Sequence, residues 1–268
     1  MNNGLLEIPK AIIRQFRTIV LGNPSGNLRG VGAVEIIPSR TTNTQVASGT
    51  SSIAIGDNSS ASASSAIALG SNSRASGQAS ISVGNSAVAS IEGAVALGDN
   101  ALSNGVNSLC VRVANTNSIS GYYAFGHSSS SRGRHQRTEL MLYATTTSTA
   151  DTRLTSNGAT AAATNQLTLR ASSAFRPSQI DIVAYDTVTG TATAWEINNV
   201  LIKRGATAGT TALVGTPTVT VLQNDMATAP TLTVSADTVN GALGITVASP
   251  TTNTTRYTAI IRTSEVGA

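Results

Sequence analysis

The sequence predicts an all-β protein: a parallel β-roll of 14-residue repeats, followed by an antiparallel β-sandwich or jelly-roll-like domain. The first observation is composition, since the 268 residues are 40% hydrophobic, 11% charged and 3% aromatic. Disordered chains carry more charge and fewer aliphatic residues, so we expect an ordered chain built from small side chains. The other two observations are a strict internal repeat and alternating strands near the C-terminus. We therefore expect an N-terminal segment (1–46), the roll (47–127), a neck or linker (128–164) and the sandwich (165–268).

Charge and cysteine content exclude several classes of protein. Cys110 is the single cysteine, which excludes an intrachain disulfide framework. The apolar stretch 5–21 is interrupted by four charged residues, so we expect neither a transmembrane helix nor a signal peptide, and no membrane insertion. The net charge of +4 comes without a dense basic patch or base-stacking aromatic residues. We therefore expect no nucleic-acid partner.

Residues 1–46 differ in kind from the repeat that follows them. Apolar side chains recur there at helical spacing, although Pro9 limits any helix to beginning near it. These side chains are Leu5, Ile8, Ile12, Phe16 and Ile19. We expect this stripe to anchor the protein to a larger particle. The alternative is an amphipathic segment that packs against other copies of the same chain.

A repeat of 14 residues defines the roll. Each unit contains a tetrad of aliphatic, small, aliphatic and glycine residues, at 53–56, 67–70, 81–84 and 95–98. A weaker tetrad follows at 109–112, where Arg112 replaces glycine, and the pattern returns at 123–126. A second series of Ala-Ser pairs, beginning at residues 47, 61, 75 and 89, keeps the same period. We expect one coil of a solenoid per repeat, with neighbouring coils paired strand to strand.

Each tetrad is interpreted as one short strand, whose glycine lets the chain turn with positive φ. The turn glycines are Gly56, Gly70, Gly84, Gly98 and Gly126. We expect the repeat residues to fill core and turn positions, with no role in binding. Two large aliphatic residues per coil contribute roughly 1.5–3 kcal/mol each when buried, whereas ordering the backbone costs about 1–2 kcal/mol per residue. A lone column is deficient, which predicts an obligate oligomer of cyclic symmetry.

At these residues the chain resembles the head repeats of YadA-type trimeric adhesins. The resemblance covers residues from about 47 to 126 and implies a left-handed parallel β-roll, with three chains packed about a threefold axis as a homotrimer. The same pattern occurs in phage tail fibres, so it is specific for architecture and not for function. Two departures, Arg112 and the aromatic tetrad at 123–126, are expected to mark the end of the roll.

Residues 128–164 begin with a polar segment that contains three arginines, at 132, 134 and 137. This segment is similar in place and charge to the basic neck of YadA-type heads, and the alternative is a solvated loop. A strand is predicted at 139–143, and the Thr-, Ser- and Ala-rich residues 144–163 are predicted to form a linker. His127 and His135 could meet their symmetry mates around a metal ion, but we expect ordinary surface or core residues and no metal or cofactor.

Residues 165–268 contain segments of period two, separated by turn signals. The predicted strands are 166–170, 179–185, 193–204, 218–222, 231–236, 243–247 and 257–263. Spacings near ten residues favour an antiparallel sandwich or jelly roll. The stretches 194–206, 211–215 and 256–266 resemble the C-terminal domain of many tailed-phage fibres. That resemblance implies a phage structural protein and is silent on the ligand.

The aromatic residues of this domain allow two interpretations. Trp195 is expected on a central strand, where a tryptophan is commonly buried. If it is exposed together with Tyr185 or Tyr257, these rings could stack on a sugar of a surface polysaccharide and form a receptor surface. The acidic residues show no clustered pair of the kind that glycoside hydrolysis requires. No nucleophile elbow, phosphate loop or metal-ligand spacing is present, so we expect no enzymatic activity.

The predicted function is a trimeric fibre or tailspike of a tailed-phage virion, made in the bacterial cytoplasm. The N-terminal segment would bind a tail hub or adaptor protein, and the C-terminal domain would bind a host receptor, with polysaccharide among the candidates. The main alternative is a capsid decoration protein, a head fibre or cement at threefold positions. Two others are a fragment of a bacterial trimeric autotransporter, for which signal and anchor are missing, and a glycan depolymerase.

Overall fold

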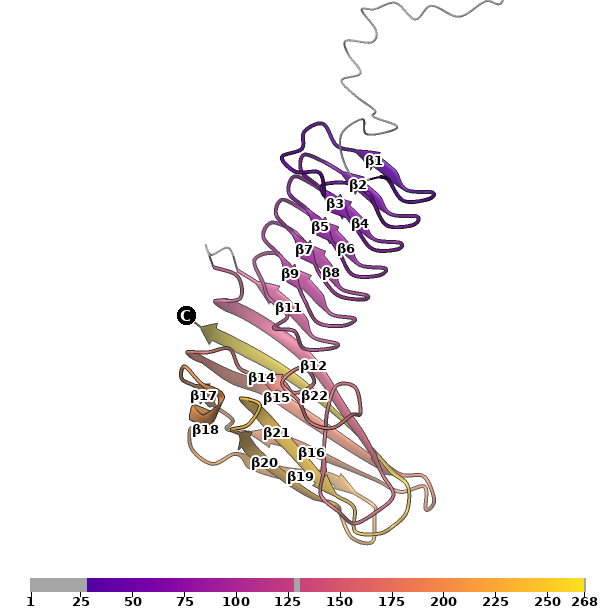
Figure 1. The fold of residues 1–268 in the computed structure, drawn as a ribbon. Helices are drawn as coiled ribbons and strands as arrows, with labels where there is room; N and C mark the ends of the chain where they lie inside the picture. Colours follow the sequence, from indigo (N-terminus) through magenta and orange to yellow (C-terminus); the bar gives the residue numbers. More distant parts are fainter. Residues whose placement is uncertain (1–27, 128–130, 268) are drawn as a thin grey trace, which may run out of the picture.

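The computed structural model describes residues 28–127 and 131–267. The predicted anchoring residues Leu5, Ile8, Ile12, Phe16 and Ile19 lie outside these ranges. As predicted, the chain is all-β, and the one helix among the described residues is the short 3-10 helix η1 (Ala208–Thr210). No helix within these ranges has the length and hydrophobicity needed to cross a membrane. Figure 1 shows an elongated molecule with stacked coils at one end and longer strands at the other.

Two series of parallel strands form the roll. The first series is β1 (Val34–Ile36), β2 (Ile53–Ile55), β4 (Ile67–Leu69), β6 (Ile81–Val83), β8 (Val95–Leu97), β10 (Leu109–Val111) and β11 (Tyr123–Gly126). The second series, on the return face, is β3 (Ser60–Ala61), β5 (Arg74–Ala75), β7 (Val88–Ala89) and β9 (Leu102–Ser103). From β2 to β11 each residue of the first series pairs with the one 14 positions later, as Ile53 does with Ile67. The predicted tetrads and their period are confirmed.

The interior of the roll is lined by small residues. Ala54, Ala68 and Ala96 are fully buried from the first series, and Ala61 and Ala75 from the second. The large aliphatic residues on either side of each small one point outward and stay partly exposed. This corrects the expectation that the tetrads bury their large residues. The two strand layers of one coil lie so close that the interior positions hold alanine, serine and, in β10, Cys110.

Glycines at the ends of the tetrads adopt positive φ. At Gly56, Gly70, Gly84 and Gly98 φ lies between +101° and +132°. A Cβ at Gly70 would lie 2.5 Å from the carbonyl oxygen of Gly84 in the next coil, so close stacking also requires glycine. Gly126 is different: it belongs to strand β11 and is not among the positive-φ glycines. The prediction of a turn glycine at position 126 is wrong, because the chain there reverses only after the strand.

The first coil begins earlier than the predicted boundary at residue 47. Strand β1 pairs in parallel with β2, which aligns Glu35 with the interior residue Ala54. The buried Glu35 carboxylate forms an ion pair with Arg40 and accepts a hydrogen bond of 3.1 Å from the Ala47 amide. Residues 34–46 therefore close the end of the roll. A charged residue at the interior position hides this coil from a search for the repeat.

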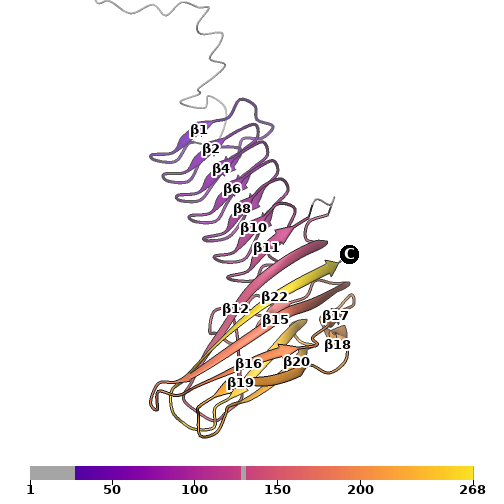
Figure 2. The same cartoon turned by 180° about the vertical axis from the view of Figure 1, so that it is seen from behind.

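The first sheet of the roll continues without a break into the C-terminal half. Strand β11 pairs antiparallel with β12 (His135–Thr146), which pairs with β22 (Thr255–Gly267). The order continues through β15 (Ser173–Asp186) and β16 (Ala192–Asn198) to β19 (Thr218–Asn224) at the far edge of this sheet (Figures 1 and 2). The predicted neck and linker thus includes a 12-residue strand of the sheet. The segment is not a separate connector, because every second side chain of β12 is buried in the core.

A second antiparallel sheet completes the predicted sandwich. It contains β13 (Thr152–Arg153), β14 (Leu167–Thr168), β20 (Thr231–Asp237) and β21 (Ala242–Ala248). The short strands β17 (Ile202–Arg204) and β18 (Ala212–Leu213) extend the long sheet beside β15. Large buried side chains from both sheets form one core, among them Leu142, Ile182, Trp195, Tyr257 and Ile245.

Candidate functional site

Two columns of large apolar side chains run along the outer face of the roll. Because strand neighbours in parallel register place their side chains on the same face, each column collects one residue per coil. We call them the outer columns: Ile53, Ile67, Ile81, Val95, Leu109 and Tyr123 in the first, and Ile55, Leu69, Val83, Leu97, Val111 and Phe125 in the second. Within the described chain no element covers this face, and every member is at least partly exposed.

A continuous apolar strip of this length is unusual on the surface of a monomeric protein. The residues that flank the strip in the turns are polar, such as Asp57, Asn72 and Asn100. The most exposed members of the strip are Tyr123 and Phe125 in the last tetrad. The outer columns are therefore the main candidate for contact with another molecule.

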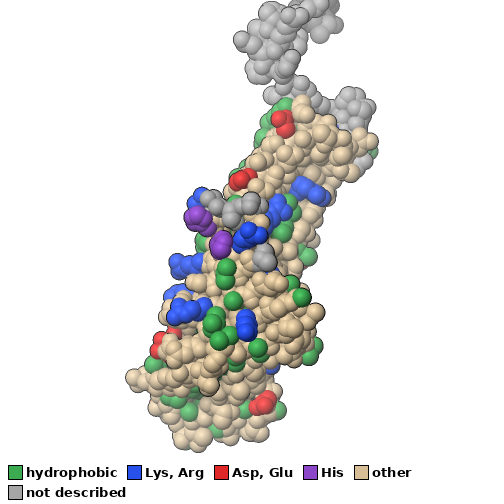
Figure 3. All heavy atoms as spheres, turned by 90° about the vertical axis from the view of Figure 1, so that its left-hand side faces the viewer, with side chains coloured by type: hydrophobic (Ala, Val, Ile, Leu, Met, Phe, Trp, Pro, Cys, Tyr) green, Lys and Arg blue, Asp and Glu red, His purple; other side chains and the backbone are tan. Residues whose placement is uncertain are grey.

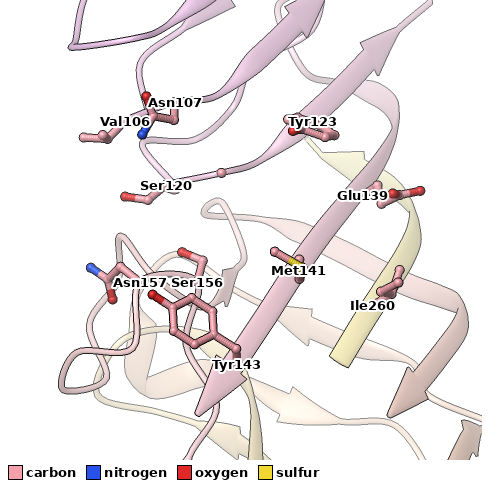
Figure 4. A pocket seen from close by; sticks show the side chains of 11 residues that line it. Val106, Asn107, Ser120, Tyr123, Glu139, Met141, Tyr143, Ser156, Asn157 and Ile260 are labelled. Atoms are coloured by element: carbon pink, nitrogen blue, oxygen red, sulfur yellow. The ribbon is translucent and has the colours of Figure 1, made fainter. Parts of the chain in front are cut away.

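A groove lies where the roll meets the sandwich. Its volume is about 620 Å³. Figure 4 shows Val106, Asn107 and Ser120 on one side, Tyr143, Ser156 and Asn157 on another, and Tyr123, Met141, Glu139 and Ile260 across it. We call this the junction groove. Its surface combines apolar side chains with amides, hydroxyls and one carboxylate.

Local contacts hold the walls of the junction groove in place. The Tyr143 amide donates to the Thr155 carbonyl at 2.8 Å, and the Thr155 amide donates back at 3.2 Å. Gly158 has a φ of +69°, and a Cβ there would lie 2.8 Å from the Tyr143 ring. The Arg262 guanidinium forms an ion pair of 3.0 Å with Glu139. The groove is thus preformed, and its carboxylate is already partnered within the chain.

A buried polar cluster joins the last coil to the sandwich. The Glu265 carboxylate of β22 accepts hydrogen bonds from the Tyr122 hydroxyl, from Gln136 at 2.6 Å and from Thr138 at 2.6 Å. The Arg170 guanidinium lies 3.9 Å away. Burial raises the pKa of the Glu265 carboxyl even though these donors act to lower it. Burial also raises the pKa of Tyr122, and the neighbouring carboxylate adds to this effect.

The sequence carries no signal for this cluster, because its members lie far apart in the chain. Glu265 is one of the acidic residues that show no clustered motif. Its role here is structural: one carboxylate holds donors from β12 and from the turn before β11. Removing a single member would leave buried polar atoms without partners, which is costly.

The predicted receptor surface of Tyr185, Trp195 and Tyr257 is not formed. Tyr185 is 47% exposed on β15, whereas Trp195 and Tyr257 are only 2% and 1% exposed. Trp195 lies on β16 and faces the second sheet, in agreement with the interpretation of a buried core tryptophan. The prediction of a stacking surface is therefore wrong for Trp195 and Tyr257, because both rings belong to the sandwich core.

The two histidines lie at the facing ends of β11 and β12, where the His127 amide donates to the His135 carbonyl at 3.2 Å. Both side chains are exposed, and Figure 3 shows them among basic side chains on one face of the molecule. Arg132 from the loop between these strands donates to the carbonyl oxygens of Asn100 and Ser86, both at 2.8 Å. Across residues 28–127 and 131–267, no group of three or more His, Cys, Asp or Glu is placed to hold a metal ion.

Comparison with protein families agrees with the geometry of the coils. Residues 47–73 and 75–108 match the model of the YadA head domain repeat, in two copies. These segments are YadA head repeats. The YadA head repeats span β2 to β9, whereas the first coil, the aromatic tetrad and the whole sandwich lie outside the match. No curated protein matches the chain. The matched segments are typical of trimeric adhesins, and they indicate an adhesive structural protein.

Proposed function

We propose that this protein is a homotrimeric, non-enzymatic adhesive fibre or spike of a tailed-phage virion, held together through the outer columns. The observation that carries the proposal is the placement of the large residues of the YadA head repeats. The roll buries alanine and serine inside each chain and leaves its isoleucine, leucine and valine side chains on the outer face. That arrangement fits a chain whose hydrophobic core forms between copies.

The energetics favour such an assembly. An outer-column side chain that is already half-buried gains roughly 1 kcal/mol when a neighbour covers the rest of it. Twelve of these side chains per chain, in two straight columns, give a long contact with little polar surface to desolvate. Three copies around one axis close the assembly and leave no column exposed. The left-handed turn of the roll and the threefold symmetry, which the resemblance to YadA-type heads implies, are part of this proposal.

The phage origin and the role in host attachment rest on the combination of parts. YadA head repeats followed by a fibre-like β-domain are an arrangement that fits a spike protein. The sandwich lies at the opposite end of the molecule from the N-terminal coil (Figures 1 and 2). We propose that the N-terminal segment binds a tail hub or adaptor protein. Three sandwiches presented together would then bind a host receptor with avidity.

The assembly is tested by substituting one outer-column residue. Leu97→Asp would place three carboxylates in an apolar contact, where unpaired charge is strongly unfavourable. We expect the wild-type chain to have the mass of a trimer by light scattering, and the variant to dissociate. Val239→Asp is the matched control, because Val239 is exposed at the turn between β20 and β21 and lies off this face. A Leu97→Asp variant that stays trimeric would show that the outer columns are not the contact.

The location on the particle is tested by electron microscopy of intact virions labelled with gold-conjugated antibody to the protein. Label at a few positions on the tail supports the tail fibre, and purified protein should then block adsorption to host cells. Label spread over the head would instead identify a capsid decoration protein. Failure to block adsorption would remove the host-binding role and leave the assembly intact.

A further inference from the structure

We propose that the contact between chains continues past the roll, so that the three sandwiches pack around the same axis and a neighbouring copy fills each junction groove. This inference rests on the proposed trimer. It concerns a different part of the chain, outside the matched YadA head repeats. In this inference the junction groove is filled by a second copy of this protein.

The register of the long sheet carries the argument. Residues paired across neighbouring strands place their side chains on the same face. Tyr123 of the first outer column pairs with Glu139, Glu139 pairs with Arg262, and Arg262 pairs with Gln179. The face that bears the outer columns is therefore the same face across β12, β22 and β15. The opposite face of these strands packs on the second sheet.

Large apolar residues continue along this face. Two positions beyond the Tyr123 row, Met141 pairs with Ile260, and both are exposed, Met141 to 56%. Tyr143 and Val183 follow on the same face and are also exposed. A self-sufficient sandwich would place polar residues here, as an antiparallel sheet usually does on its solvent side. The outer columns themselves run on into Glu139 and Arg137, but Met141 lies diagonally next to Tyr123 across β11 and β12, so the apolar surface adjoins the columns at Tyr123.

The charges on this part of the face do not oppose close contact. Glu139 is paired with Arg262, and Arg262 also donates to Gln179 at 2.8 Å. This row is therefore neutral and satisfied within the chain. The other arginines on the face, Arg137, Arg176 and Arg256, lie towards the ends of the strands. The Asp181 carboxylate lies in the row of Met141 and Ile260, and it accepts a hydrogen bond of 2.6 Å from Gln179. The charged groups within the face thus have partners in the same chain, and the other three arginines lie at its margin, as is usual for an interface.

The junction groove fits a neighbouring chain better than a small polar ligand. Tyr123, Met141 and Ile260 extend the outer columns into the groove, and the Glu139 carboxylate is already engaged by Arg262. In Figure 4 the amides of Asn107 and Asn157 lie on one side, away from Glu139 and Ile260. A chain that packs on the outer columns would meet this surface next, because β11 pairs directly with β12.

The test uses single cysteine variants of the full-length chain. Met141→Cys places a thiol in the proposed contact, and Val239→Cys places one at an exposed turn outside it. The native Cys110 is buried, and burial raises the pKa of its thiol to about 12, so it stays unreactive while the protein is folded. Maleimide labelling rates and cross-linking with a short bismaleimide are then measured on material of known mass.

We expect the new thiol of the Met141→Cys variant to react about ten-fold or more slowly than that of the Val239→Cys variant in the trimer, since labelling then requires local opening of the contact. The bismaleimide should link two chains of the Met141→Cys variant covalently. Equal labelling rates in a protein of trimer mass would overturn this inference and leave the proposed function standing. A wild-type chain of monomer mass would overturn both. Ile260→Cys, on the adjacent strand, repeats the experiment if Met141→Cys does not fold.

Discussion

The roll and the sandwich share one sheet but use their side chains in opposite ways. In the roll the interior holds alanine and serine, such as Ala68 and Ser82, and the large residues lie outside. In the sandwich the largest side chains, such as Trp195 and Phe175, are buried between two sheets of the same chain. The sandwich thus has a core of its own, whereas in the proposed trimer the roll obtains most of its apolar burial from neighbouring chains.

This difference separates two sources of stability. Substitutions in the sandwich core should lower the stability of each chain whatever its oligomeric state. Substitutions on the outer columns should act mainly through assembly, and therefore depend on protein concentration.

The sandwich core should be the most sensitive region. Trp195→Ala removes the largest buried side chain and should lower the free energy of unfolding by about 3–5 kcal/mol. Urea unfolding followed by circular dichroism measures this change. Tyr185→Ala is the control, because Tyr185 is exposed on the outer face of the same sheet. Equal losses for the two variants would contradict the assignment of the core.

The turns of the roll should be nearly as sensitive. Gly70→Ala introduces a side chain at a φ of +125° and within 2.5 Å of the Gly84 carbonyl oxygen. We expect a loss of roughly 2–3 kcal/mol, since strained backbone of this kind costs about 1–3 kcal/mol before any clash is counted. Gly209→Ala should have little effect, because the nearest atom to its Cβ would be 4.0 Å away. If Gly70→Ala left the stability unchanged, the coils would not be closely stacked at this position.

The buried cluster at the junction should make stability depend on pH. The pKa of Glu265 is raised by burial above its unfolded value of about 4.3. The folded state therefore holds this proton more tightly, and the stability that Glu265 contributes is lost as pH rises through its folded pKa. Relative to Glu265→Gln, the wild-type protein should lose stability as pH rises above about 4.3, up to and through the folded pKa of Glu265. The midpoints of urea unfolding, measured for both proteins at increasing pH, test this loss of stability.

Asp186 is the matched control with the opposite sign. A hydrogen bond of 2.8 Å from Asn253, together with backbone donors, lowers the pKa of its carboxyl. The stability that Asp186 contributes is present above its unfolded pKa and is lost as pH falls through the folded one. Relative to Asp186→Asn, the wild type should therefore weaken in acid. If the stability difference between wild type and variant changed with pH in the same direction for Glu265→Gln and Asp186→Asn, the opposite pKa shifts assigned to the two residues would be contradicted.

Cys110 should show the smallest effect. It occupies the interior position that alanine holds in most other coils, in register with Ala96 and Ala124. Cys110→Ala should change the free energy of unfolding by less than about 1 kcal/mol, because the site loses one atom at a position built for alanine. Thermal unfolding provides the measurement. Cys110→Leu should be clearly destabilising, and a tolerated leucine would show that the interior is wider than the structure has it.

The period of 14 residues made the roll predictable, but not which side of each strand is the inside. Alternation along Ile67, Ala68 and Leu69 is the same whether the small or the large residues face inward. The distance between strand layers decides it, and that distance follows from how the coil closes in three dimensions. The coil at 34–46 escaped detection because Glu35 stands where the other coils have a small residue, and because Glu35 pairs with a residue 19 positions later, whereas the period is 14.

In the sandwich the strands were predictable and the receptor surface was not. Tyr257, Ala259 and Ile261 alternate with Thr258 and Ile260, and this pattern favours a buried Tyr257. The junction groove and the Glu265 cluster depend on pairing between β12 and β22, which are more than 100 residues apart. No local pattern in the sequence reports such pairing, so these sites required the structure.

The most direct test of the account is the mass of the full-length protein in solution, measured by light scattering over a range of concentrations. The account predicts three times the chain mass of 27.1 kDa, with no monomer at micromolar concentration. A stable monomer of 27.1 kDa that retains its β-sheet spectrum would contradict it. In that case the outer columns would be a solvent-exposed surface, and the roll would be stable without partners.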